Sequence, residues 1–203
     1  AIGRCTASNG DQIHVKPGHV EDISAASGID FDVAGITVIG HGHGTTRPRI
    51  DWEAAEATLV VDAANTRLVN LHLVASFASV AEMINVGAVE GFEMYDCLIE
   101  DESATAEFLE AVSIADAATG VKIHGCTFIG RSTDNNAFIQ FEGTCDDVEI
   151  VGNNLIATAV QTATVALIDS ASERTAAVIA HNNLVSQRSE EHTSELQSHV
   201  RIS

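Results

Sequence analysis

The chain has 203 residues, of which 45% are hydrophobic and only 4% aromatic, and its formal net charge at pH 7 is −19. This length suits one domain with a sizeable core, and the hydrophobic fraction is too high for a disordered acidic chain. The negative charge argues against binding to nucleic acid or anionic membranes, which attract basic surfaces. No apolar run approaches the ~18 residues that indicate a membrane span, so we expect neither nucleic acid nor a membrane as a partner.

A recurring pattern of alternating apolar residues organises the chain. In its clearest copy, residues 121–128 (VKIHGCTF), apolar first and third positions are followed by a glycine turn and an apolar eighth position. Related copies begin at residues 36, 66, 92, 148 and 177, so the repeat is 26 to 30 residues long. A period of two, rich in β-branched residues and punctuated by Gly, Asn and Asp, predicts short β-strands.

Each repeat also carries a second alternating apolar pair, and the six pairs are Phe31/Val33, Leu59/Val61, Ile84/Val86, Val112/Ile114, Ile139/Phe141 and Ala166/Ile168. No segment has helical periodicity. Two to three strands per repeat, with each repeat covering its neighbour's apolar face, predict an all-β parallel β-solenoid (β-helix) of about six coils over residues 1–187. We expect a narrow interior of Val, Ile, Leu and Ala with little room for aromatic rings.

Stacking at this repeat length places equivalent residues of successive coils ~4.8 Å apart. At the sixth position of the pattern, it predicts an interior ladder in which Cys97 lies under Cys126 and Asn153 under Asn182. The asparagines are expected to satisfy backbone groups at a turn, and the cysteines to pack as small hydrophobes. The second position predicts an outward column of alternating charge that fixes the register of the coils, formed by Arg67, Glu93, Lys122 and Glu149.

The fourth position of the pattern predicts another outward column, formed by Ile39, Val69, Tyr95, His124, Val151 and Ala180. This column is more apolar than a solvated face usually is. It marks either a contact between protomers or a scatter of exposed apolar residues, and the sequence supports both interpretations equally.

The last sixteen residues, 188–203, resemble a translated short-read sequencing adapter. Residues 188–199 (RSEEHTSELQSH) match its codons residue by residue, residues 200–201 fit a six-base index, and residues 202–203 match its resumption. The segment holds two of the ten basic and three of the 29 acidic residues, so the net charge without it is −18. We interpret it as an artefactual, disordered tail, and we expect the domain at 1–187 to be truncated at both ends.

The strand pattern resembles the right-handed parallel β-helix of the pectin-lyase-like superfold. Residues 10–19 (GDQIHVKPGH) are similar to the first coil common in that group, and residues 35–50 are similar to its second. The stretch 10–185 is also similar to uncharacterised virion β-helix proteins of tailed bacteriophages. This resemblance implies a virion-associated tail or appendage protein that is often trimeric.

The acidic residues are densest in the segment 100–110, which contains Glu100, Asp101, Glu102, Glu107 and Glu110. Polysaccharide lyases on the resembled fold use Asp and Glu clusters for Ca²⁺, and glycosidases need two carboxylates ~5–9.5 Å apart. No Arg or Lys lies between Arg67 and Lys122 to serve as a nearby partner. We therefore interpret the segment as a solvated acidic loop, with a cation site and a catalytic site as the alternatives.

Two histidines, His41 and His43, alternate in a strand-like segment, so both rings are placed to face one side and chelate a metal. The preceding coil offers His14 or His19 as a third ligand; without one, two polar loop histidines are the stronger interpretation.

The four cysteines lack CxxC spacing and do not predict a disulfide framework. We expect no catalytic residue, no cofactor and no metal ligand.

Two functions remain at this point. The first is a non-catalytic structural or adhesion protein of a bacteriophage virion, an extracellular particle, which forms a homo-oligomer such as a trimer or binds other virion proteins or a surface glycan. The alternative is a polysaccharide lyase or glycoside hydrolase on the pectin-lyase-like β-helix, which rests on the analogy of fold alone.

Overall fold

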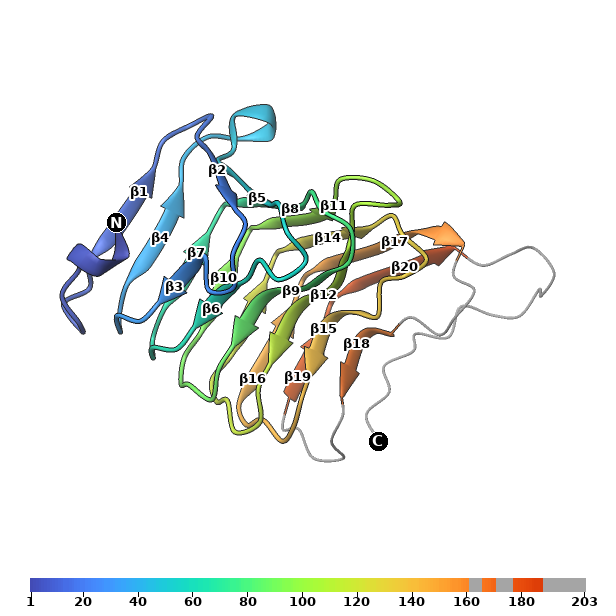
Figure 1. The fold of residues 1–203 in the computed structure, drawn as a ribbon. Helices are drawn as coiled ribbons and strands as arrows, with labels where there is room; N and C mark the ends of the chain where they lie inside the picture. The colour runs from blue at the N-terminus through green and yellow to red at the C-terminus, as the bar shows by residue number, and fades with distance from the viewer. Residues whose placement is uncertain (161–165, 171–176, 188–203) are drawn as a thin grey trace.

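The structure of the chain, a computed structural model, describes residues 1–160, 166–170 and 177–187. These residues form an all-β parallel β-solenoid of about six turns, and no α-helix occurs among them (Figure 1). The predicted fold class is confirmed. The adapter-like segment 188–203 lies outside the described residues.

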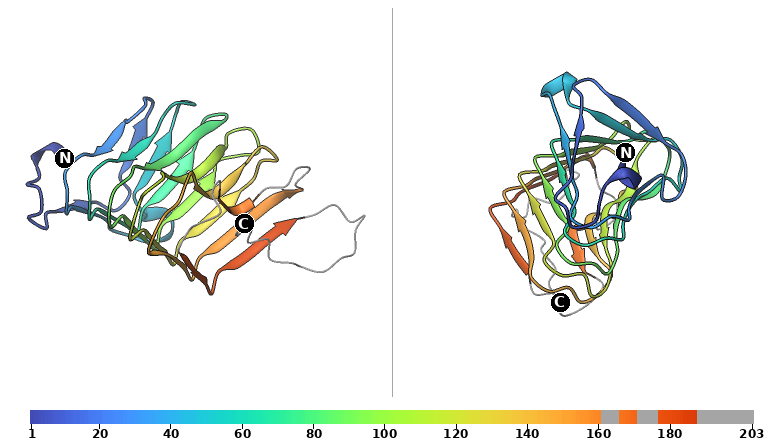
Figure 2. Two further views of the ribbon diagram at one scale, coloured as in Figure 1. Left: turned by 90° about the horizontal axis from the view of Figure 1, so that it is seen from below. Right: turned by 90° about the vertical axis from the view of Figure 1, so that its left-hand side faces the viewer.

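Each turn contributes one strand to each of three sheets that run along the molecule, and the turns lie one behind the other in Figure 2. All strand pairs among the described residues are parallel, and each joins one coil to the next. The first sheet, sheet A, comes from the first half of the repeated pattern. Its strands are β1 (Gln12–Val15), β4 (Thr37–Gly40), β7 (Arg67–Val69), β10 (Glu93–Tyr95), β13 (Lys122–His124), β16 (Val148–Val151) and β19 (Ala177–Ala180).

The second sheet, sheet B, comes from the second half of the pattern and lies along the top of Figure 1. Its strands are β2 (Val20–Ile23), β5 (Arg49–Trp52), β8 (His72–Ala75), β11 (Leu98–Asp101), β14 (Thr127–Gly130), β17 (Asn154–Val160) and β20 (Asn183–Gln187). The third sheet, sheet C, has the strands β3 (Ile29–Phe31), β6 (Leu59–Val61), β9 (Val80–Val86), β12 (Phe108–Ile114), β15 (Ala137–Phe141) and β18 (Ala166–Ser170). Two short 3₁₀ helices, Ile2–Arg4 and Gly44–Thr46, lie outside the sheets.

The register of sheet C corrects two of the six predicted apolar pairs. Leu59, Ile84, Val112 and Ile139 stack as predicted. At the two ends of the sheet, however, Ile29 rather than Phe31 lies beside Leu59, and Ile168 rather than Ala166 lies beside Ile139. The two end pairs were therefore misplaced by two residues, a shift that leaves each side chain on the same face of its strand.

The corner between sheets A and B is two residues long in five successive coils, and its first residue is left-handed in each. The residues are Asn70, Asp96, Gly125, Gly152 and His181, with φ between 53° and 68°. Glycine adopts this conformation freely, and Asn, Asp and His adopt it more readily than other residues. The small or polar turn position in the sequence pattern is thus a backbone requirement.

The second residue of this corner points inward and forms the predicted ladder. Cys97 and Cys126 are both buried. Asn153 donates through Nδ2 to the Ile123 carbonyl (2.8 Å) and accepts from the Cys126 N–H (2.8 Å). Asn182 repeats the arrangement one coil later, donating to the Ile150 carbonyl at 2.7 Å and accepting from the Asn153 N–H at 2.9 Å. The asparagines satisfy backbone groups of the turn, as predicted.

The interior holds more rings than the sequence predicted. Trp52 and six of the seven phenylalanines are buried, and only Phe77 is exposed. The Phe138 ring meets the Phe108 ring edge-on, with centroids 5.4 Å apart, and stacks at 6.2 Å on Phe128 across the corner between sheets. The expectation of little room for rings is therefore wrong, because rings pack against one another both within a coil and between coils.

Candidate functional site

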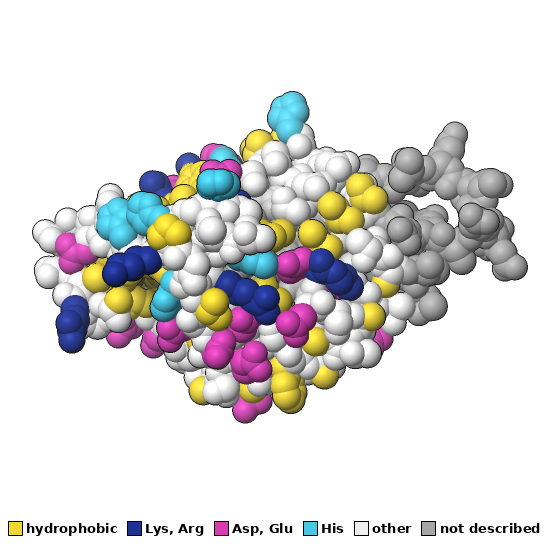
Figure 3. Space-filling view, turned by 90° about the horizontal axis from the view of Figure 1, so that it is seen from above, with side chains coloured by type: hydrophobic (Ala, Val, Ile, Leu, Met, Phe, Trp, Pro, Cys, Tyr) yellow, Lys and Arg dark blue, Asp and Glu magenta, His cyan; other side chains and the backbone are white. Residues whose placement is uncertain are grey.

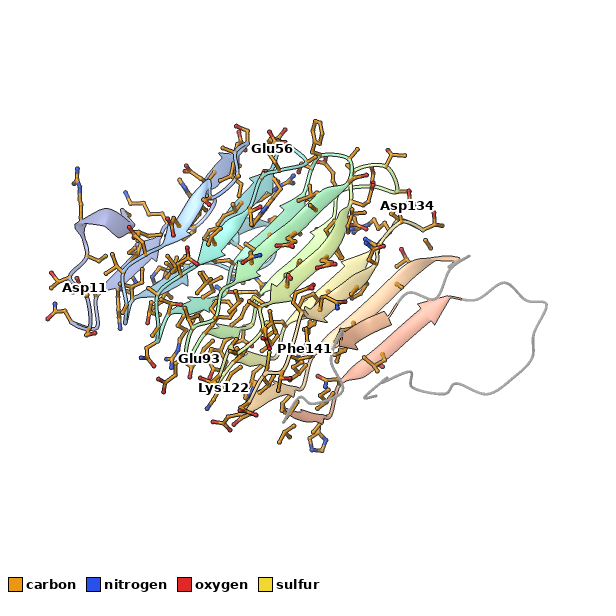
Figure 4. The ribbon with its side chains drawn as sticks, turned by 60° about the horizontal axis from the view of Figure 1, so that its bottom comes forward. Asp11, Glu56, Glu93, Lys122, Asp134 and Phe141 are labelled. Carbon is orange, nitrogen blue, oxygen red and sulfur yellow. The ribbon has the colours of Figure 1, made fainter. Side chains whose placement is uncertain are left out.

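The outward charge column on sheet A has the predicted register, in which Arg67, Glu93, Lys122 and Glu149 are neighbours in turn. Arg67 Nε donates to Glu93 Oε2 at 2.6 Å, and Lys122 Nζ lies 3.7 Å from Glu149 Oε1. Glu93 and Lys122, labelled in Figure 4, lie on neighbouring strands. The Arg67 side chain keeps 47% of its exposure, so these are surface ion pairs that fix register at small energetic gain.

The more apolar column beside it also has the predicted register, and all six of its members are half-buried. The guanidinium of Arg67 lies 5.4 Å from the centroid of the Tyr95 ring, which meets the His124 ring edge-on at 5.4 Å. Burial, with the Glu93 carboxylate, raises the pKa of the Tyr95 hydroxyl. The column is a continuous surface of rings and aliphatic groups along one side of sheet A.

A small polar hollow of about 190 Å³ lies next to the charge column, lined by Thr37, Asn65, Thr66, Arg67, Gly91 and Glu93. Thr66 Oγ1 is buried and has no hydrogen-bond partner. The lining offers both donors and acceptors, as a small hydroxylated ligand requires.

The acidic segment 100–110 departs from its predicted solvated state. Asp101 is fully buried and Glu107 is 3% exposed. Glu107 accepts hydrogen bonds from the backbone N–H (3.0 Å) and hydroxyl (3.2 Å) of Ser79 on the preceding coil. The interpretation as a solvated loop is therefore wrong for these two residues, because neighbouring coils supply partners that are distant in sequence.

Asp101 lies at the end of β11, where the chain leaves sheet B, and it joins loops of neighbouring coils. Its oxygens accept hydrogen bonds from three backbone N–H groups and one amide: Phe108 (3.0 Å), Arg131 (2.6 Å), Ser132 (3.3 Å) and the Asn135 side chain (3.1 Å). Burial raises the pKa of Asp101 to about 6, against the opposing effect of these hydrogen bonds. The carboxyl group is thus enclosed by protein and closed to a substrate.

Glu100 faces the other side of β11 and lies between the side chains of His72 and Arg131. His72 Nε2 is 2.7 Å from its Oε1, and Arg131 Nη2 donates to its Oε2 at 2.6 Å. Hydrogen bonding from His72, with a further contribution from Arg131, lowers the pKa of Glu100 to about 2. Glu100 therefore remains ionised at the pH where a general acid must hold a proton.

Glu102 has a partner from two coils earlier, since Arg49 Nη2 lies 3.3 Å from its Oε1. Arg49 also donates from Nε to Asp51 Oδ1 at 2.5 Å, and the Ser76 hydroxyl donates to the same oxygen at 3.0 Å. The face on the sheet B side carries basic side chains among acidic and histidine side chains (Figure 3). The lack of an Arg or Lys nearby in the sequence was therefore misleading, because both Glu100 and Glu102 have an arginine partner from another coil.

One pair of carboxylates escaped the sequence analysis. Glu82 on β9 lies in register beside Glu110 on β12, and both side chains are half-buried. Asn85 Nδ2 donates to Glu82 Oε2 at 2.5 Å. The sequence could have shown this pair, because each glutamate lies two residues before the first member of its repeat's apolar pair, Ile84 or Val112.

Of the histidine cluster considered as an alternative to two polar loop histidines, only one contact forms. His14 and His41 meet through their ring nitrogens, 2.7 Å apart. His43 precedes the 3₁₀ helix Gly44–Thr46, where its backbone N–H donates to Thr46 Oγ1 (3.2 Å). His19 lies beside Glu21 at 3.2 Å. Over the described ranges of the chain, no group of three or more His, Cys, Asp or Glu is placed to hold a metal ion.

All four cysteines are free, and Cys97, Cys126 and Cys145 are buried. Burial raises the pKa of the Cys126 and Cys145 thiols. Both therefore favour the unreactive thiol form, consistent with packing rather than chemistry.

In the part of the chain that the structure describes, no helix is both long and apolar enough for a membrane span.

No family model matches the chain, and neither a curated protein nor a solved structure does. The class of protein that the observations define is therefore the fold itself, a parallel β-solenoid of about six turns.

Proposed function

We propose that the chain is a non-catalytic structural or adhesion module of a bacteriophage virion, built on the right-handed pectin-lyase-like β-helix that its sequence resembles. In this role it belongs to a tail or appendage of the extracellular particle. It associates as a trimer or with other virion proteins, and a surface glycan is a further candidate partner.

The observation that carries the proposal is the bonding between successive coils, which occurs on several sides of the solenoid. Sheet A has ion pairs between coils, the corner between sheets A and B has the asparagine ladder, and the end of sheet B has the Asp101 network. The stability of a solenoid depends on contacts between neighbouring repeats. Such bonding favours a stiff, elongated scaffold, which suits a virion appendage.

The half-buried column that contains Val69, Tyr95 and Val151 is the surface that we assign to contact between protomers. Size-exclusion chromatography with light scattering on the full chain tests this assignment. We expect the mass of three chains, a lower mass for Val151→Asp, and no change for Thr127→Asp, a control on sheet B that is also half-buried. A monomer at every concentration contradicts the assignment.

Whether the chain belongs to a virion is tested separately, by identifying the genes that neighbour its own gene. Neighbouring genes for capsid, portal or tail proteins support the proposal, whereas a neighbourhood of sugar-metabolising enzymes contradicts it.

A second candidate is a polysaccharide lyase or glycoside hydrolase, favoured by the register of Glu82 and Glu110. Adjacent coils place their backbones ~4.8 Å apart, and two carboxylates ~5–9.5 Å apart serve glycoside hydrolysis. Reducing-end and unsaturated-uronate assays over a polysaccharide panel test it. Turnover that is lost in Glu82→Gln and Glu110→Gln but kept in Glu142→Gln supports an enzyme. Turnover that survives the first two changes, or none at all, contradicts this site.

A further inference from the structure

Two exposed histidines on neighbouring coils bring one ring nitrogen each to the same point. His14 lies in β1, and His41 directly follows β4, its partner strand in sheet A. His14 Nδ1 is 2.7 Å from His41 Nε2, the ring centroids are 5.0 Å apart, and the planes are inclined by 27°. The distance between the ring centroids is close to the distance between the two nitrogens plus one ring radius for each ring. Both nitrogens therefore lie on the line that joins the two ring centres. One of them donates a hydrogen bond and the other accepts it.

The backbone around His41 is held in place from two directions. Asn70 Nδ2 donates to the carbonyls of Gly40 (2.8 Å) and Gly42 (3.0 Å), one on each side of His41. The His41 N–H donates to the Val15 carbonyl at 2.9 Å, which ties it to the end of β1. The Cα positions of both histidines are therefore set by the sheet and its corner, and only the side-chain torsions are free.

We propose that His14 and His41 together bind a divalent transition-metal ion of the kind that imidazole prefers, Zn²⁺, Ni²⁺ or Cu²⁺. The other coordination positions are open to solvent, because both side chains are exposed. The net charge of −19 favours the approach of any cation. Two donors give a site of modest affinity.

The separation of the nitrogens needs only a small adjustment to bind the ion, whereas each ring must turn by roughly 35–45° to aim its lone pair at it. Metal–nitrogen bonds of about 2.0–2.1 Å hold two imidazole nitrogens roughly 2.9–3.4 Å apart at square-planar or tetrahedral angles. The rings must separate by a few tenths of an ångström and turn so that both lone pairs meet at the ion. The hydrogen between the facing nitrogens moves through solvent to the other nitrogen of its own ring. Both imidazoles then bind in their neutral form, and no redox change occurs.

Isothermal titration of the full chain with NiCl₂ and with ZnCl₂ tests the proposal. His14→Ala and His41→Ala should each weaken the site about tenfold or more, because a single imidazole remains. His19→Ala and His43→Ala are matched controls, exposed histidines on the same two coils, and should leave the site unchanged. His14→Gln serves as a second variant that keeps a hydrogen-bonding side chain, and circular dichroism checks that each variant folds.

Electron paramagnetic resonance of the Cu²⁺-loaded chain gives an independent readout of the ligands. Wild type should show two coordinated imidazole nitrogens, and each single variant should show one fewer. The proposal is overturned if metal binding is absent, if it is unaffected by changes at His14 or His41, or if the control changes weaken it equally.

Discussion

Charged side chains occupy two contrasting environments in this solenoid: the open face of sheet A and the closed corner after sheet B. On sheet A, Arg67 and Glu93 form an ion pair in which the arginine keeps 47% of its exposure. At the corner, Asp101 is fully buried and bonded to backbone groups of two loops. Exposed charged side chains that pair give up contacts with water for a contact with each other, so the net gain in stability is small. A buried carboxylate that loses its partners, in contrast, costs much stability. The two regions therefore stabilise the same stack by very different amounts.

The largest effect is expected from Asp101→Ala. The change leaves the N–H groups of Phe108 and Arg131 without their acceptor, and we expect a loss of about 3–5 kcal/mol in the free energy of unfolding. Denaturant unfolding followed by circular dichroism measures it. A loss below about 1 kcal/mol would show that water replaces the carboxylate and that the corner is not closed.

Asn153→Ala should cost about 2 kcal/mol, because it leaves the Cys126 N–H and the Ile123 carbonyl unpaired in the interior. The control is Asn183→Ala, which removes an exposed asparagine side chain that donates to the Asn154 side chain at 2.7 Å. Unfolding midpoints of the two variants provide the comparison. Equal losses would mean that the ladder contributes no more than a surface hydrogen bond.

Glu100 and Asp101, neighbours in sequence, should give opposite pH dependences of stability. The pKa of Glu100 is lowered to about 2, so its contribution is complete above its ordinary pKa of 4.5 and is lost as the pH falls toward 2. The pKa of Asp101 is raised to about 6, so its contribution is present below its ordinary pKa of 3.8 and is lost as the pH rises through 6. Each contribution is at most about 3 kcal/mol, because a change of one pKa unit corresponds to ~1.4 kcal/mol.

Unfolding free energies of wild type, Glu100→Gln and Asp101→Asn, measured from acidic to neutral pH, separate the two contributions. The advantage of wild type over Glu100→Gln should shrink on acidification, and its advantage over Asp101→Asn should shrink on neutralisation. Parallel pH profiles for the two variants would contradict the assignment.

The smallest effect is expected on the open face. Lys122→Glu places three carboxylates in one column, with Glu93 and Glu149 on either side, and should cost about 0.5–1 kcal/mol. The loss should diminish in high salt, because exposed charges are screened. Lys122→Gln serves as the neutral control. A loss that does not respond to salt would show that packing, rather than charge, fixes the register there.

Much of the fold could be predicted from the sequence, because period-two alternation repeated at a nearly constant interval favours coils stacked with equivalent residues side by side. The Asn153 and Asn182 ladder and the column from Arg67 to Glu149 followed directly from that register. The errors at the two end coils have a physical reason. A shift of two residues keeps apolar side chains on the same face, so alternation alone does not distinguish Phe31 from Ile29 as the partner of Leu59.

The surroundings of the acidic segment could not be predicted in the same way. Glu100 meets Arg131, 31 residues later, and Glu102 meets Arg49, 53 residues earlier. Arg49 begins β5, whereas Glu102 and Arg131 lie in loops after sheet B whose lengths differ between coils, so the repeat does not align these pairs. The contact between His14 and His41 was anticipated only as one of several groupings, because the loop after β4 interrupts the regular corner.

The corner between sheets A and B keeps its length of two residues through five successive coils, while the spacing between these corners varies from 26 to 29 residues. In these coils the variation in length must therefore be accommodated in the strands and at the other two corners. This division gives the chain a practical use as a display scaffold. Peptides inserted after sheet B or after sheet C should be tolerated, whereas a single residue added at the short corner should disrupt every coil above it.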